Sequence, residues 1–121
     1  MKRILICSLA LIFVSCSGNM KLSPSETAKT VVESFYHGDK STLKKYTTSE
    51  GYANLVSIQD MFAQDKKSES HFMIIDELTD GHVAWIKYST VYDPKPGVFK
   101  LVQEDGQWKV THNGPRDKGP F

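Results

Sequence analysis

Apolar residues follow two different periods along this chain. Between residues 28 and 62 they recur every three or four positions, and between residues 71 and 112 they come closer to alternation. The first spacing is typical of amphipathic helices, and the second is typical of half-buried strands. The pattern therefore predicts helices first and a meander of antiparallel strands afterwards, which is an α+β fold.

The first predicted helix has a strong start signal. In residues 23–26, Ser23 can cap the backbone amide of Glu26, and the Glu26 side chain can reach back to form a capping box. Pro24 suits the first helical position because its φ is already helical and it has no amide to satisfy. One apolar stripe follows, made of Ala28, Val31, Val32, Phe35 and Tyr36. We expect Gly38 to end this helix.

Two further helices are expected before the strands. Asp39 is placed to cap a short second helix, which carries Leu43 and Tyr46 on one face. Residues 47–51 are expected to form a turn, and residues 65–70 a polar loop. The third helix is indicated by Leu55, Ile58 and Phe62.

Four strands are expected, over residues 71–78, 82–92, 98–104 and 107–112. Asp80-Gly81 and Asp105-Gly106 are both signals for two-residue hairpin turns. Residues 94–97 contain two prolines, which do not fit inside a sheet, so a loop is expected there.

The two turns also predict which residues pair. The pairs expected in the second hairpin are Glu104 with Gln107, Gln103 with Trp108, Leu101 with Val110 and Phe99 with His112. The pairs expected in the first hairpin are Met73 with Tyr88 and Ile75 with Ile86 on the core face, and Asp76 with Trp85 on the outer face. A one-residue bulge would reverse the two faces of the first hairpin.

The N-terminus is typical of a secretory signal. Lys2 and Arg3 precede an apolar run of about 11 residues (4–14), which is too short to cross a bilayer core of roughly 30 Å. Residues 13–16, Phe-Val-Ser-Cys, resemble a bacterial lipobox, in which the chain is cut just before a diacylated cysteine. The resemblance departs from the usual pattern at Phe13, where leucine is commonest. An ordinary secretory signal with a chance cysteine is the alternative.

A domain organisation follows from these features. We expect a lipoprotein signal peptide (1–15), a lipidated Cys16 with a tether (16–22), a folded domain (23–112) and an irregular tail (113–121). Two or three acyl chains on Cys16 would keep the protein on a membrane, because a single chain holds only marginally. By resemblance to bacterial lipoprotein sorting, a residue other than aspartate after the lipidated cysteine, here Ser17, favours the outer membrane. The protein is therefore expected at the cell envelope, anchored in the outer membrane and facing the periplasm.

Composition and charge exclude several classes of site. The 121 residues carry a net charge of +1, and removal of Lys2 and Arg3 leaves 13 basic against 14 acidic residues, so no nucleic-acid partner is expected. The two cysteines rule out a Cys₄ zinc site, and the four histidines lie far apart in sequence. No phosphate-binding or dinucleotide-binding motif is present, so we expect neither a metal nor a cofactor.

Two segments carry a family resemblance. Residues 33–39, Glu-Ser-Phe-Tyr-His-Gly-Asp, with Leu43, Tyr46 and Thr47 behind them, resemble the opening of nuclear transport factor 2-like proteins. Residues 101–110 are similar to the closing hairpin of the same superfamily. More narrowly, the chain resembles small bacterial lipoproteins of unknown function within it, also called cystatin-like or lumazine-binding-like. The likeness covers roughly residues 24–112.

The resemblance implies a curved sheet wrapped around a long helix. In relatives this cone often holds a ligand or forms a homodimer. Some relatives are isomerases or dehydratases that use an aspartate base, or an aspartate–histidine pair, with tyrosine or aspartate donors. We therefore expect a module that binds a small ligand or a protein partner without catalysing a reaction.

The candidate ligand-binding residues are mostly aromatic: Tyr36, Tyr88, Tyr92, Phe99, Trp108 and His112. Aromatic walls with a few polar tips are typical of small-molecule sites, although the same residues would also serve as core. Two alternatives remain. One is a small lyase or isomerase in which His112 and a tyrosine form the acid–base pair. The other is an adaptor or immunity-type protein that docks through Phe72, Ile74 and Trp85 on the outer face.

Overall fold

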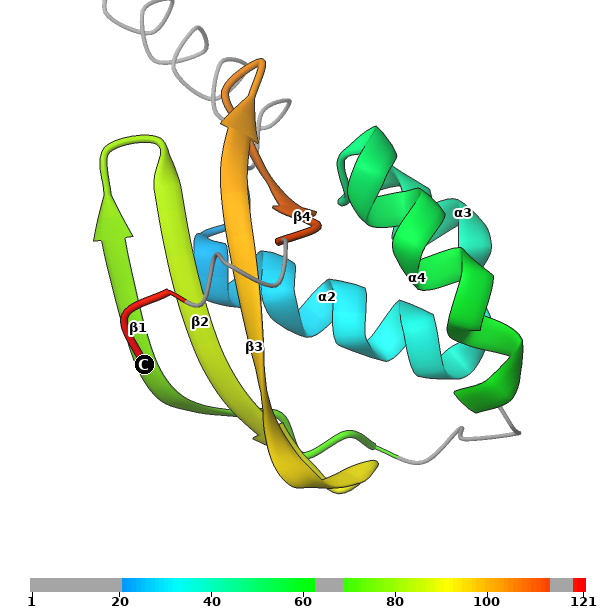
Figure 1. The fold of residues 1–121 in the computed structure, drawn as a ribbon. Helices are drawn as coiled ribbons and strands as arrows, with labels where there is room; N and C mark the ends of the chain where they lie inside the picture. The colour runs from blue at the N-terminus through cyan, green and yellow to red at the C-terminus, as the bar shows by residue number, and fades with distance from the viewer. Residues whose placement is uncertain (1–20, 63–68, 114–118) are drawn as a thin grey trace, which may run out of the picture.

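The computed structural model describes residues 21–62, 69–113 and 119–121, and it confirms the predicted order of helices and strands (Figure 1). The helices are α2 (Pro24–His37), α3 (Lys40–Lys45) and α4 (Ser49–Phe62). The strands are β1 (Met73–Asp80), β2 (Val83–Thr90), β3 (Asp93–Glu104) and β4 (Gln107–Thr111). The predicted signal peptide and Cys16 lie outside the described residues.

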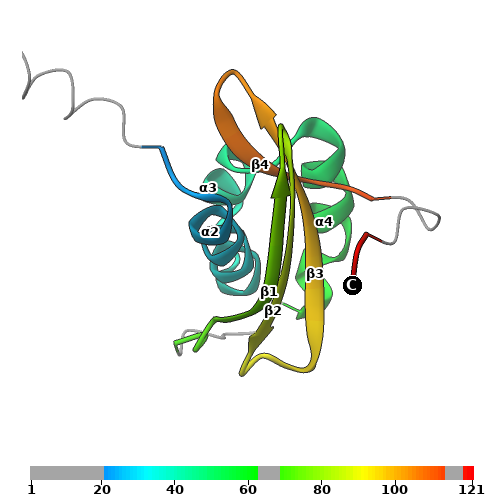
Figure 2. The same ribbon diagram turned by 90° about the vertical axis from the view of Figure 1, so that its left-hand side faces the viewer.

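The four strands form one antiparallel sheet in the order β1-β2-β3-β4. Figure 2 shows α2 on one side of this sheet and the C-terminal residues on the other. The α+β fold predicted from the sequence, helices packed on a curved antiparallel sheet, is therefore confirmed.

The start and end of α2 are those that the sequence predicts. The Ser23 hydroxyl accepts a hydrogen bond from the Glu26 amide at 3.2 Å, and the Glu26 carboxylate accepts one from the Ser23 amide at 2.9 Å. Gly38 ends the helix with a φ of 76°, a left-handed conformation that glycine adopts without strain.

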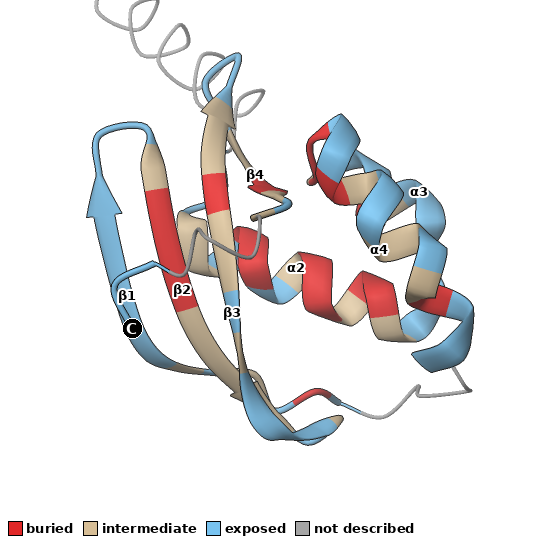
Figure 3. Ribbon diagram, viewed as in Figure 1, coloured by how far each residue is buried: buried red, intermediate tan, exposed pale blue. Residues whose placement is uncertain are grey.

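The core lies between α2 and the middle of the sheet (Figure 3). Its fully or almost fully buried members are Ala28, Val31, Phe35, Leu43, Ala84, Ile86, Leu101 and Val110. Four of the five residues in the predicted stripe of α2 are buried, and the fifth, Tyr36, is half-buried. Burying about one face of a helix in this way supplies most of its stability.

The helix α4 begins earlier than expected, so the turn predicted at residues 47–51 is wrong. The Thr48 hydroxyl accepts a hydrogen bond from the Gly51 amide at 3.0 Å and so caps the N-terminus of α4. The sequence prediction did not recognise Thr48 as a helix cap. The first turn of α4 also lies directly against β4. A Cβ at Gly51 would stand 2.5 Å from the carbonyl oxygen of Val110, so this close approach requires glycine.

The register of the second hairpin is confirmed in three of its four predicted pairs. Glu104 faces Gln107, Gln103 faces Trp108 and Leu101 faces Val110. The strand β4 ends at Thr111, so the predicted pair of Phe99 with His112 lies beyond the paired residues.

The register predicted for the first hairpin is wrong. Asp80 pairs with Val83, so the turn is formed by residues 81–82, one position later than expected. A bulge between Ile74 and Asp76 then shifts the pairing by one more residue at the start of β1 and the end of β2. Ile74 is therefore opposite Tyr88.

The shift at the turn moves the pairing by two positions and keeps the faces, whereas the bulge reverses the faces at the start of β1. Met73 and Ile75, expected in the core, are 64% and 49% exposed. Phe72 and Ile74 pack against the core instead. Asp76 is exposed opposite Lys87, where Trp85 was expected.

The loop predicted at residues 94–97 is also wrong, because β3 begins at Asp93. Thr90 pairs with Asp93 and Tyr88 with Gly97, so residues 94–96 face only residue 89. Prolines are tolerated in a strand at such an irregularity, since the ladder needs no amide from them there.

Candidate functional site

An apolar cavity of about 180 Å³ lies between α2, α4 and the strands β2 and β3. We call it the aromatic pocket; its lining comprises Val32, Phe35, Tyr36, Leu55, Ile58, Phe62, Tyr88, Asp93 and Phe99. Three of the predicted site residues, Tyr36, Tyr88 and Phe99, meet here. The helices contribute three aliphatic and three aromatic side chains, and the sheet contributes Tyr88, Asp93 and Phe99.

Aromatic rings pack against one another on the sheet side of the pocket. The ring centre of Tyr88 is 4.9 Å from that of Phe99 and 5.3 Å from that of Phe72. Gly97 makes room for this arrangement, because a Cβ there would stand 2.5 Å from the Tyr88 hydroxyl. The Tyr88 ring therefore packs between Phe72, which precedes β1, and the residues Gly97 and Phe99 of β3.

Tyr92 lies beside the aromatic pocket and is not part of its lining. Its ring centre is 4.6 Å from that of Tyr36, and its hydroxyl is 3.0 Å from Nε2 of His37. Tyr92 and His37 thus support Tyr36 from outside. The structure places this predicted site residue next to the pocket, in contact with its wall.

Asp93 is the one carboxylate in the lining, and it influences two tyrosines. Burial raises the pKa of Tyr88, and the nearby Tyr36 and Asp93 raise it further. Burial also raises the pKa of Tyr36, with Asp93 again adding to the effect. Both hydroxyls are therefore neutral at pH 7 and can act as hydrogen-bond donors.

The other two predicted site residues lie in separate depressions. Trp108 lines one of about 190 Å³ together with Thr27 and Tyr46. His112 is exposed and lines one of about 150 Å³, which it shares with Phe99. Neither a tyrosine nor an acidic residue lines that second depression, so the predicted pairing of His112 with a tyrosine is not formed among the described residues.

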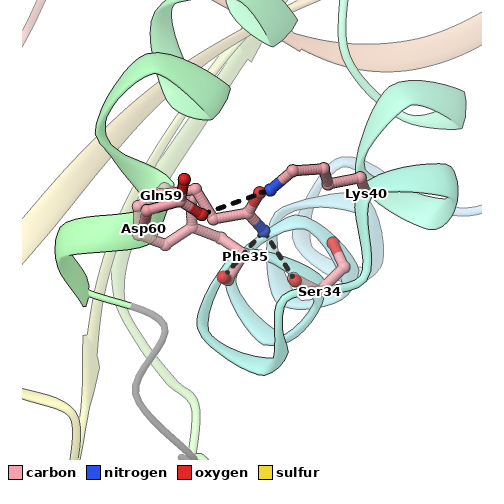
Figure 4. Close-up of polar contacts among 5 residues, drawn as sticks. All are labelled: Ser34, Phe35, Lys40, Gln59 and Asp60. Carbon is pink, nitrogen blue, oxygen red and sulfur yellow. Dashed lines mark hydrogen bonds and ion pairs between the residues drawn. The ribbon is translucent and has the colours of Figure 1, made fainter.

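Gln59 is a positioning residue that the sequence reasoning missed (Figure 4). It is fully buried, and its Nε2 donates to the carbonyl oxygens of Phe35 at 3.0 Å and Ser34 at 3.4 Å. Its Oε1 accepts from Nζ of Lys40 at 2.6 Å, and Lys40 also lies 3.5 Å from the carboxylate of Asp60. This network ties α4 to the end of α2, the two helices that line the aromatic pocket.

Asp93 was missed for a different reason. It stands beside Pro94 in the segment predicted as a loop, and its Oδ1 accepts from the Lys95 amide at 2.9 Å, as a turn-forming aspartate would. Only the long-range pairing of β2 with β3 brings it next to Tyr36 and Tyr88.

The docking surface predicted around Phe72, Ile74 and Trp85 does not exist as one patch. Phe72 and Ile74 belong to the core side of the sheet. Trp85 faces the other side but is only 9% exposed. Gly119 lies against its ring, since a Cβ there would stand 2.6 Å from it.

The described part of the chain offers neither a cluster of metal ligands nor a helix that could span a membrane. Residues 21–62, 69–113 and 119–121 contain no group of three histidine, cysteine or acidic side chains placed to hold a metal ion. Within the same ranges, no helix combines the length and apolarity that crossing a bilayer requires.

Comparisons with known proteins identify the fold. No family model and no curated protein sequence matches the chain. A crystal structure from Campylobacter jejuni, provisionally named an NTF2-like transpeptidase, matches with a TM-score of 0.56 at 15% identity, over 76% of this chain and 100% of that one. An NTF2-like protein of unknown function from Silicibacter pomeroyi matches with a TM-score of 0.59 at 12% identity, over 70% of this chain and 84% of that one. The fold of this chain is therefore that of the nuclear transport factor 2-like proteins.

Proposed function

We propose that this domain binds a small, mostly apolar molecule in the aromatic pocket. The observation that carries the proposal is the lining: an apolar wall interrupted only by Asp93 and two tyrosines. Small-molecule sites combine apolar surface with a few polar groups in this way. The nuclear transport factor 2-like fold, in which relatives often hold a ligand inside the cone, supports the same function.

The size of the pocket limits the ligand. Its volume of about 180 Å³ is below the range of roughly 300–1,000 Å³ that is usual for drug-sized ligands. An apolar cavity of about 150 Å³ can hold benzene. We therefore expect one ring or a short aliphatic chain.

The polar groups define which ring should bind best. Tyr36 and Tyr88 stay protonated because burial and Asp93 raise their pKa values. The Asp93 carboxylate offers an acceptor at the same wall. A ring that carries one hydroxyl group can both donate to Asp93 and accept from a tyrosine, so a phenol satisfies the site better than benzene.

The test uses p-cresol as the probe and the full chain. Titration followed by NMR should shift the amides of residues 88, 93 and 99 in a saturable way. Ile58→Trp should abolish the shifts by filling the pocket, whereas Leu78→Trp, at a 47% exposed position of β1, should leave them unchanged. Equal binding by both variants, or no binding by the unaltered chain, would remove the proposal.

We further propose that Cys16 carries the acyl chains of a membrane anchor. The basic start, the short apolar run and the lipobox-like residues 13–16 support this anchor. Cys16→Ser should release the protein from the membrane fraction of a bacterial host, and Cys7→Ser is the matched control that should not. Mass spectrometry that finds an unacylated N-terminus other than Cys16 would overturn the anchor.

A second candidate function is a lyase or isomerase reaction in the same pocket. The observation that favours it is the carboxylate of Asp93 beside two protonated tyrosines, since a base and an oxyanion donor are what enolisation needs. Cyclohexanone incubated with the full chain in deuterated water should then exchange its α-protons faster than in buffer. Asp93→Asn should remove that exchange, and an unchanged rate with the unaltered chain eliminates this candidate.

A further inference from the structure

A second depression, at the N-terminal end of α2, differs in chemistry from the aromatic pocket, which is lined by the C-terminal half of that helix. It has a volume of about 190 Å³ and lies where the start of α2, the end of α3 and the start of β4 meet. Its polar members are Lys21, Thr27, Lys45, Tyr46, Gln107 and Trp108. We call it the lysine depression. It shares no lining residue with the aromatic pocket.

The lining of the lysine depression favours a negative ligand. It contains two lysines and no acidic residue. The acid of the neighbouring first turn, Glu26, is already engaged, because its carboxylate accepts from the Ser23 amide at 2.9 Å. The Lys21 ammonium lies next to Gly106 in the second hairpin turn, and Nζ of Lys45 lies 5.5 Å from the ring centre of Tyr46.

Thr27 supplies an independent observation. It lines the lysine depression, it is completely buried, and its hydroxyl has no hydrogen-bond partner among the described residues. A buried hydroxyl without a partner costs about 1–3 kcal/mol. An anionic oxygen bound beside the two lysines could accept a hydrogen bond from the Thr27 hydroxyl and so provide the missing partner.

We propose that the lysine depression binds a phosphate group, with Thr27 as a hydrogen-bond donor and Lys21 and Lys45 as the compensating charges. The position of Thr27 in the first turns of α2 adds the positive end of the helix dipole. This site goes beyond ligand binding in the aromatic pocket and does not depend on it.

The phosphate has two possible sources, a free phosphate compound or the headgroup of a phospholipid. If Cys16 is acylated, the five residues to Lys21 can span at most about 18 Å, so the lysine depression would stay close to the bilayer surface. The proposed anchor bears only on whether the phosphate group belongs to a lipid headgroup. The proposal that the depression binds a phosphate group does not depend on the anchor.

The experiment follows the indole resonance of Trp108 by NMR in the full chain. Inorganic phosphate, added against chloride at equal ionic strength, should shift it in a saturable way. Thr27→Val and Lys45→Gln should each weaken the affinity by about tenfold, as loss of a hydrogen bond or charge to an anion predicts. Lys44→Gln is the matched control, because its side chain lines another depression, and it should bind like the unaltered chain.

A second arm identifies the source. Short-chain phosphatidylglycerol replaces inorganic phosphate, with short-chain phosphatidylcholine as its control. A Trp108 shift with phosphatidylglycerol alone, still lost in Thr27→Val, assigns the site to an anionic lipid headgroup, whereas a shift with inorganic phosphate assigns it to free phosphate compounds.

Thr27→Val also separates binding from folding. Removing the orphaned hydroxyl while keeping the shape should leave the urea midpoint unchanged or higher, because nothing in the fold uses that donor. Phosphate affinity equal to that of the unaltered chain in this variant, or no Trp108 shift in either arm, would overturn the proposal.

Discussion

Gln59 is the side chain that connects the two helices of the aromatic pocket. It is fully buried and satisfies two carbonyl oxygens at the end of α2 and one lysine of α3 at the same time. Sequence periodicity gave no reason to expect this, because a glutamine between Ile58 and Phe62 has the composition of a solvated position. Only packing of α4 across α2 turns it inward.

Replacing Gln59 should therefore destabilise the domain. Gln59→Ala removes the hydrogen bonds of the buried amide to the Phe35 carbonyl and to Lys40, and it leaves a cavity between α2 and α4. The expected loss is about 1–3 kcal/mol in the free energy of unfolding. Asp60→Ala removes only an exposed ion pair of the same Lys40 and should cost under about 1 kcal/mol. Urea unfolding monitored by circular dichroism measures both, and equal stability of the two variants would contradict this role.

Tyr88, the more deeply buried of the two pocket tyrosines, gives the domain a pH dependence at alkaline pH. The pKa of Tyr88 is raised in the folded state by burial, so the unfolded chain loses that proton first as the pH increases. The stabilisation is complete below pH 10 and declines as the pH rises above it. Melting temperatures between neutral pH and pH 11 should fall less steeply in Tyr88→Phe than in the unaltered chain. A parallel decline in both would show that Tyr88 contributes nothing.

At the scale of elements, the two hairpins show where the sequence is informative. The second hairpin turns at Asp105-Gly106 as predicted, and its apolar alternation continues without interruption, so its register follows from local signals alone. In the first hairpin the turn moves by one residue and a bulge follows at Ile75. Because the side chains of a strand alternate with a period of two, the shift at the turn keeps the faces of β1, and the bulge reverses them at the start of the strand. Neither change is indicated by the local sequence.

The close contact between α4 and β4 determines whether Gly51→Ala stabilises or destabilises the domain. In an isolated helix, alanine is more favourable than glycine by about 0.5–1 kcal/mol. At Gly51 the added Cβ would meet the backbone oxygen of Val110 at 2.5 Å, and a backbone atom cannot move aside alone. Gly51→Ala should therefore lower the unfolding free energy by about 1–3 kcal/mol, as overpacking does. An increase in stability by the same urea measurement would mean that α4 does not lie against β4 as described.

At the scale of the whole molecule, Figure 2 shows α2 on one side of the sheet and the end of the chain on the other. The predicted fold accounts for the first side, since the stripe of α2 and the apolar faces of β2 to β4 were visible in the sequence. The outer face of the sheet and the irregular tail (113–121) were predicted separately, without a contact between them. The contact between Gly119 and Trp85 joins residues 34 positions apart and depends on where the tail turns, which no local pattern specifies.

This tail contact can be removed without touching the helices. Gly119 has a φ of 70° and stands so close to Trp85 that a side chain would collide with its ring, so Gly119→Val should displace the C-terminal residues. Trp85 then becomes accessible, and quenching of tryptophan fluorescence by acrylamide should increase. Gly81→Val is the matched control: its φ of 64° imposes a similar backbone strain at the first hairpin, but no atom lies within 4 Å of the added Cβ. Greater quenching in Gly119→Val alone shows that the last residues shield the outer face of the sheet. Equal quenching in both variants shows instead that the sheet itself covers Trp85, through Lys100 on the neighbouring strand.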